Sequence, residues 1–171
     1  IEIRQKGLGS VEAKAEFGLS HRFIGEFDSA EHLLKIALKL SKEQNYSQGI
    51  ADVYEKQGIL YSVSGKLDDS LECFYKAVDL QKKFNNKLSQ TKLFNNISES
   101  FIKLNQWDDA FAVFEKSKSL KVELELEEML HTTYAQFGNL YKDMGDYSKA
   151  IKNYYIALGI EKEYELNMFV Q

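Results

Sequence analysis

A period of 40 residues runs through the whole chain and constrains its fold more than any other feature. Six positions near the end carry glycine, alanine or tyrosine: Gly138, Tyr141, Gly145, Ala150, Tyr154 and Ala157. Eighty residues earlier the same slots hold Gly58, Tyr61, Gly65, Ser70, Phe74 and Ala77, and the register is kept in all four copies. A fixed period of roughly 20–50 residues is typical of stacked-repeat architectures.

Each 40-residue copy predicts two helices joined by a short turn. In the last copy, Met129, Tyr134, Phe137 and Tyr141 are spaced so that they form one apolar helical stripe. The sequence has no proline, a residue that costs about 3 kcal/mol inside a helix. The first helices are expected near 4–24, 47–64, 88–104 and 126–144, and the second helices near 27–43, 67–83, 107–122 and 147–164. We therefore expect an almost entirely helical chain without strands.

The turn inside each copy has its own pattern. Glycine at 25, 65 and 145 favours the left-handed conformation that ends a helix, and Asn105 departs from this pattern. Two slots then follow, one apolar (Phe27, Leu67, Trp107 and Tyr147) and one polar (Asp28, Asp68, Asp108 and Ser148), and we expect the polar residues to cap the second helix. The small residues Ala30, Ser70, Ala110 and Ala150 are expected to face Gly18, Gly58, Ser98 and Gly138, where two helices approach closely.

These patterns, GxLYxxxGxxxxSxxxFxxA in the second copy and GNLYKDMGDYSKAIKNYYIA in the fourth, resemble the tetratricopeptide repeat (TPR). The resemblance implies an all-α, right-handed superhelical solenoid of four helix-turn-helix units and eight helices, with units at about 4–43, 44–83, 84–123 and 124–163. The 40-residue unit is similar to the long-unit branch of the family, found in bacterial peptide-pheromone receptors, bacterial signalling proteins and some eukaryotic scaffold proteins. Residues 164–171 align with the start of a further helix, so we expect a fragment of a longer array.

The sequence offers no pattern for catalysis or metal binding. His21, His32 and His131 occupy different slots of the repeat and lack the convergent spacing of a zinc site. Cys73, the single cysteine, is expected to be a small buried side chain. We therefore predict no enzyme, no metal and no cofactor.

Charge and hydropathy limit the partners. The net charge is −4, acidic and basic residues are mixed, and no apolar run reaches the ~18 residues that span a bilayer. We expect neither nucleic acid nor a membrane to be the partner of this chain. One cysteine is compatible with a reducing compartment, and a cytoplasmic location is expected.

By the TPR resemblance, the first helix of each unit lines a concave groove that binds protein or peptide. The residues that fall on this side are Glu12, Arg22, Asp52, Glu55, Lys92, Asn95, Glu99, Lys103, Asn139 and Lys142. Asparagine amides can pair with a peptide backbone, and lysines can bind a carboxylate. Acids predominate in the first two units and bases in the last two, so the acidic or C-terminal end of a ligand is expected to lie toward the fourth unit.

The leading functional hypothesis is a non-catalytic protein- or peptide-binding module, the sensory or partner-docking part of a larger bacterial regulatory protein. The alternative is a peptide-gated regulator whose DNA-binding or catalytic effector domain lies outside these residues. A third hypothesis is a structural array that self-associates through an exposed terminal repeat, where Met168 and Phe169 would lack a covering neighbour.

Overall fold

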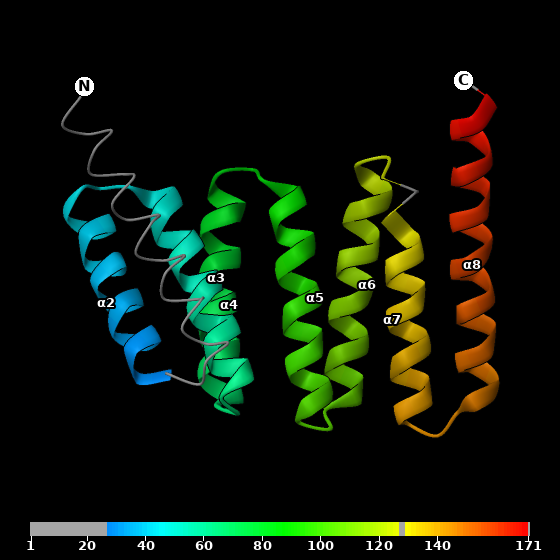
Figure 1. Cartoon of the computed structure of the whole chain (residues 1–171), viewed down its shortest axis with the longest axis horizontal. Helices are drawn as coiled ribbons and strands as arrows, with labels where there is room; N and C mark the ends of the chain where they lie inside the picture. The colour runs from blue at the N-terminus through cyan, green and yellow to red at the C-terminus, as the bar shows by residue number, and fades with distance from the viewer. Residues whose placement is uncertain (1–26, 127–128, 171) are drawn as a thin grey trace. The chain divides into compact units, whose positions relative to one another are not determined.

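The computed structural model describes residues 27–126 and 129–170, and this part of the chain consists of helices and short turns without a strand (Figure 1). The helices are α2 (Phe27–Glu43), α3 (Ser47–Val63), α4 (Leu67–Lys83), α5 (Lys87–Lys103), α6 (Trp107–Glu123), α7 (Leu130–Asp143) and α8 (Tyr147–Val170). They form two compact halves, one ending at Ser89 and the other beginning at Gln90. Each half is described by itself below.

The helices lie close to their predicted positions. Helices α2 and α4 begin and end at the predicted residues, and α3, α5 and α6 differ by one residue. Helix α7 begins at Leu130, four residues later than predicted. Seven helices are described, and the predicted helix near 4–24 lies outside the described residues.

The predicted start of a further helix at residue 164 is wrong, because α8 continues without a break to Val170. Glu165, the slot 20 residues after Gly145, lies inside this helix, although Glu125 in the equivalent slot 40 residues earlier forms a turn. Continuing the helix keeps the backbone hydrogen bonds of this segment within α8. The side chains of Met168 and Phe169, on which the predicted sticky end depended, lie outside the described side chains.

The same turn recurs every 20 residues, both within and between the predicted repeats. One residue in each turn has a positive φ: Asn45, Gly65, Asn85, Asn105, Glu125 and Gly145, with φ from 51° to 81°. The backbone N–H after it closes the helix end, as from Lys66 to the Tyr61 carbonyl oxygen at 2.9 Å, which is the pattern of a Schellman cap. Asn105 therefore replaces glycine without changing the turn, since asparagine tolerates this conformation.

The N-cap positions lie two residues before the predicted caps. Asp68, Asp108 and Ser148 are the second residues of α4, α6 and α8, and the preceding N-cap positions Lys66 and Gln106 make no side-chain capping bond. At the start of α8 it is Asp146 that caps, because its Oδ1 accepts the Lys149 backbone N–H at 3.1 Å. The acids in the first turns of α4 and α6 still face the positive end of the helix dipole.

The small slots pack as predicted in the N-terminal half. Ala30, Leu34, Ala37, Val53 and Leu60 form a core between α2 and α3. The Ser70 hydroxyl donates a 2.8 Å hydrogen bond to the Gly58 carbonyl oxygen, so these two small residues do face each other. A Cβ on Gly58 would lie 2.6 Å from the Phe74 ring, which is why a glycine is required there.

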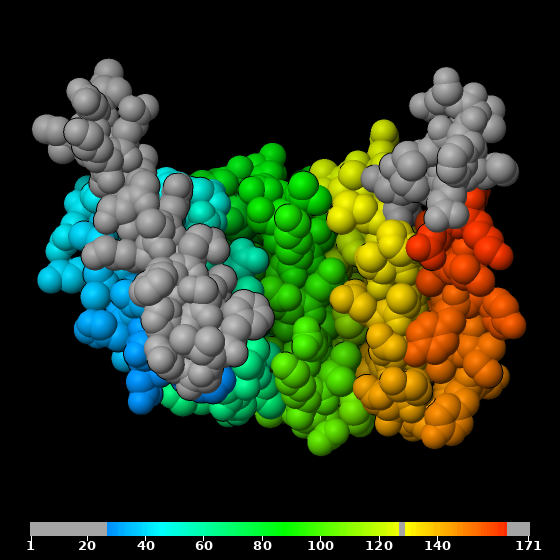
Figure 2. All heavy atoms as spheres, viewed as in Figure 1, coloured from blue at the N-terminus to red at the C-terminus, as the bar shows by residue number. Residues whose placement is uncertain are grey.

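The C-terminal half is built around aromatic rings. Phe114 and Phe137 are buried with Ala110 and Leu140, and the two ring centroids lie 5.4 Å apart. Here too a glycine lies under a ring, since a Cβ on Gly138 would lie 2.6 Å from Cδ1 of Tyr154. Helix α7 packs against α6 and against α8, which lies at the edge of this half (Figure 2).

Candidate functional site

Eight of the ten predicted groove residues fall in the described part of the chain, and all eight lie on first helices. Glu12 and Arg22 lie outside the described residues. In the N-terminal half, Asp52 and Glu55 lie on α3, and both are half-buried. The Asp52 carboxylate accepts a 2.9 Å hydrogen bond from Nε2 of Gln48, so it is partly occupied within its own helix.

In the C-terminal half, four predicted residues form one row along α5. Lys92, Asn95, Glu99 and Lys103 are spaced three or four residues apart, which brings them onto one helix face. Lys92, Glu99 and Lys103 are exposed, and Lys103 Nζ lies 3.3 Å from Glu99. Since exposed pairs of this kind contribute little to stability, these side chains can exchange partners at small cost.

The two asparagines predicted to hold a peptide are already used by the fold. Asn95 Oδ1 accepts a 2.9 Å hydrogen bond from the Ser117 hydroxyl on α6. Asn139 Oδ1 accepts a 2.7 Å hydrogen bond from the Tyr154 hydroxyl on α8. The side-chain carbonyl oxygen of each asparagine therefore bonds to a neighbouring helix. The amide N–H groups of each side chain are the donors that could bind a ligand. These two contacts could not be predicted from the sequence, because each joins two helices that pair only in the folded chain.

Helix α7 adds Lys142 to the exposed surface of this half. Its Nζ lies 3.7 Å from Asp143, and both side chains are exposed. Together the exposed residues of α5 and α7 supply ammonium groups, a carboxylate and an amide. Such a mixed set can bind carboxylates and backbone carbonyls of a protein segment, and it offers no nucleophile or general base with a partner in place.

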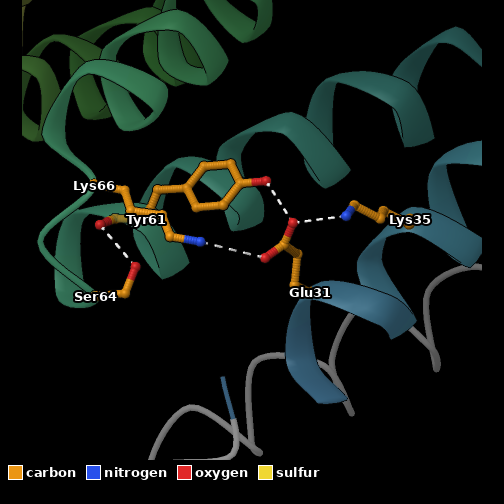
Figure 3. Close-up of polar contacts among 5 residues, drawn as sticks. All are labelled: Glu31, Lys35, Tyr61, Ser64 and Lys66. Carbon is orange, nitrogen blue, oxygen red and sulfur yellow. Dashed lines mark hydrogen bonds and ion pairs between the residues drawn. The ribbon is translucent and has the colours of Figure 1, made fainter. Parts of the chain in front are cut away.

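A polar cluster joins α2 to α3 and was not predicted from the sequence (Figure 3). The carboxylate of Glu31 accepts from the Tyr61 hydroxyl at 3.2 Å, and it lies 2.7 Å from Lys35 Nζ and 3.6 Å from Lys66 Nζ. The hydrogen bond from Lys35 lowers the pKa of Glu31 below its usual value. Burial, helped by the charge of Glu31, raises the pKa of Tyr61 to about 12. The cluster, called the clasp below, stabilises the packing of α2 against α3, and its charges are already paired.

Reactive side chains do not gather anywhere in the described residues. Among these residues no three of His, Cys, Asp and Glu are placed to hold a metal ion. His32 is exposed and His131 is half-buried. Cys73 is buried as predicted, and burial raises the pKa of its thiol to about 11, so the thiol is protonated at neutral pH. No described helix has the length and hydrophobicity needed to cross a bilayer.

Comparison with known proteins identifies the family. The model of the soluble NSF attachment protein family, SNAP, matches residues 27–165. The chain belongs to the SNAP family. No curated protein matches the sequence.

Several solved structures share the fold of this chain. BtubC (BKLC) from P. vanneervenii has a TM-score of 0.77 at 18% identity, with 91% of this chain covering 64% of that protein. Aspartyl phosphate phosphatase F from Bacillus subtilis has a TM-score of 0.79 at 14% identity, with 91% of this chain covering 41% of that protein. MamA has a TM-score of 0.66 at 18% identity, with coverage of 96% and 85%. At these identities the likeness concerns the fold, and it confirms a TPR-like helical repeat, an architecture typical of protein–protein interaction.

Proposed function

We propose that this SNAP-family chain is a non-catalytic adaptor that binds a protein or peptide partner through the exposed residues of its first helices. The observation that carries the proposal is the exposed row on α5, where Lys92, Glu99 and Lys103 stand on a helix whose opposite face is buried. The family's name describes attachment to a partner protein, NSF. An attachment role of the same kind, toward a partner of its own, fits a repeat that presents polar side chains without catalytic chemistry.

Lys92 and Lys142 are the groups proposed to bind a partner's carboxylates, and Asn139 donates its amide N–H to a backbone carbonyl. Exposed ion pairs contribute little individually, whereas a hydrogen bond in a desolvated contact contributes about 0.5–1.5 kcal/mol. Several contacts of this size are needed for a stable complex. The partner's acidic or C-terminal end is proposed to lie toward α7.

Charge reversal tests this proposal against a matched control. The variant Lys92→Glu with Lys142→Glu changes two exposed lysines on first helices. The control Lys116→Glu with Lys152→Glu changes two exposed lysines on second helices of the same half. Proteins captured from native lysate by the wild-type chain are identified by mass spectrometry, and each variant is then compared for capture of the same proteins.

The proposal expects the first variant to lose at least about tenfold in capture, equivalent to about 1.4 kcal/mol, while the control captures as the wild type does. Circular dichroism confirms that both variants keep their helices. Equal capture by all three chains would overturn the proposal. A loss confined to the control would place binding on the second helices instead.

A second candidate is that this chain forms the sensory part of a larger, cytoplasmic bacterial regulator, with a DNA-binding or catalytic effector elsewhere. It is favoured by the match to phosphatase F from Bacillus subtilis, where the matched part is 41% of a longer protein. The mass of the endogenous protein, measured by immunoblot in its source cells, tests this candidate. A mass equal to that of these 171 residues, 19.7 kDa, would contradict it.

A further inference from the structure

One face of α8 is far more exposed than the same face of α6. Tyr147, Ile151 and Leu158 are 65%, 54% and 42% exposed. They are spaced four and seven residues apart, so they form a single stripe along the helix. The equivalent α6 residues, 40 positions earlier, are Trp107, Phe111 and Lys118, and all three are half-buried.

Helix α7 is what covers this face of α6. The Phe111 ring lies 4.9 Å from the Phe137 ring and 5.4 Å from the Tyr141 ring. Lys118 Nζ lies 5.7 Å from the ring of Tyr134. Three aromatic residues of α7 therefore cover the stripe on α6, and two of them, Phe137 and Tyr141, are four residues apart. The equivalent stripe on α8 is exposed.

The two stripes end in residues of opposite charge. On α6 the stripe ends at Lys121, whose Nζ is buried and donates to Thr133 Oγ1 at 2.7 Å and to the Met129 carbonyl oxygen at 3.4 Å. Forty residues on, the slot holds Glu161, which is exposed. A helix lying on α8 as α7 lies on α6 would bring its N-terminal turn to Glu161. A carboxylate there is favoured both by the positive end of a helix dipole and by a basic side chain.

We infer that the stripe of Tyr147, Ile151, Leu158 and Glu161 docks an amphipathic helix of a partner protein, antiparallel to α8. The docked helix carries two apolar or aromatic side chains four residues apart, which pack on Ile151 as Phe137 and Tyr141 pack on Phe111. Its first turn carries a basic residue that pairs with Glu161. The surface continues an interface that this half already forms between α6 and α7, and it is separate from the first-helix residues of the proposed function.

The test uses a peptide of defined sequence. The probe is residues 129–144 of this chain, with Thr133→Lys to complement Glu161, labelled with a fluorophore. A hydrocarbon staple joins positions 135 and 139, on the side that faces away from α6, since Asn139 contacts Tyr154 on α8. The staple pre-forms the helix and lowers the entropic cost of binding. Binding is followed by fluorescence anisotropy.

The matched variants are Ile151→Asp, within the stripe, and Ile156→Asp, at an isoleucine 36% exposed on another side of α8. We expect saturable binding to the wild type, weakened at least about tenfold by Ile151→Asp and little changed by Ile156→Asp. Circular dichroism checks that each variant is folded. No saturable binding, or equal weakening by both variants, would overturn the inference.

A charge swap tests the orientation. The Thr133→Lys peptide should bind the wild type about twofold to fivefold more tightly than a Thr133→Glu peptide, the range expected for an exposed pair. In the Glu161→Lys chain the order should reverse, and an unchanged order would overturn the antiparallel arrangement. If light scattering instead shows a wild-type dimer that Ile151→Asp dissociates, the stripe joins two copies of this chain, and the inference of a partner's helix is wrong.

Discussion

Replacement of glycine by alanine should change the free energy of unfolding in opposite directions at two glycines of the C-terminal half, because only one of them lies under an aromatic ring. Gly138 lies on α7 under the Tyr154 ring, and an added Cβ would lie 2.6 Å from Cδ1 of that ring. Gly159 lies at an exposed position of α8, where an added Cβ would meet no described atom within 4 Å. Alanine stabilises a helix interior by about 1 kcal/mol relative to glycine at either position.

The clash at Gly138 outweighs this gain. The ring must move by roughly 1 Å to reach ordinary contact at 3.4 Å, and overpacking of this kind costs about 1–3 kcal/mol. The movement also strains the 2.7 Å hydrogen bond from Tyr154 to Asn139, which contributes about 0.5–1.5 kcal/mol. We expect Gly138→Ala to destabilise by about 1–2 kcal/mol, and Gly159→Ala to stabilise by about 1 kcal/mol.

Urea unfolding followed by circular dichroism measures both values, and the two variants should differ by about 2–3 kcal/mol. For a chain of this length the difference corresponds to melting temperatures separated by roughly 5–10 °C. If Gly138→Ala stabilises as much as Gly159→Ala, the ring does not lie on Gly138 and the account of the small slots fails.

Three further predictions concern packing, capping and pH. Ala150→Leu should destabilise by about 1–3 kcal/mol, because Ala150 is only 2% exposed where two helices meet, whereas Ser148→Ala should leave urea unfolding nearly unchanged, since Ser148 is exposed and does not cap α8. Glu31 has a lowered pKa in the folded chain, so its contribution is present above its ordinary pKa of 4.5 and is lost as the pH falls below it; the stability difference between wild type and Glu31→Gln should therefore shrink between pH 7 and pH 3. Cys73, with its pKa raised to about 11, should react with a thiol reagent at pH 8 only after unfolding in urea, and rapid reaction in the native chain would contradict its burial.

Most of the fold could be predicted from the sequence because the residues that end and begin each helix recur in several copies of the repeat. Glycine, an apolar residue and an acid recur at the same spacing, so α2 and α4 could be placed to the residue. The cap at Asp146 could not be predicted, because it lies two residues before the expected Ser148. The unbroken course of α8 could not be predicted either, since a glutamate forms a turn at position 125 but continues the helix at position 165.

The candidate site could be predicted only in part. Helical spacing was enough to bring Lys92, Glu99 and Lys103 onto one exposed face of α5. The engagement of Asn95 by Ser117 could not be foreseen, because it depends on which helix packs beside α5. The same holds for the clasp around Glu31, whose partner Tyr61 is 30 residues away in the sequence.

The central claim, that this SNAP-family chain binds its partner through its first helices, is tested most directly by site-specific photo-crosslinking. A benzophenone amino acid replaces Lys92 on α5 in one chain and Lys116 on α6 in another, both exposed positions of the same half. Each chain is irradiated in native lysate, and the crosslinked products are resolved by mass. We expect a discrete crosslinked partner from position 92 and none from position 116. A partner captured only from position 116 would contradict it.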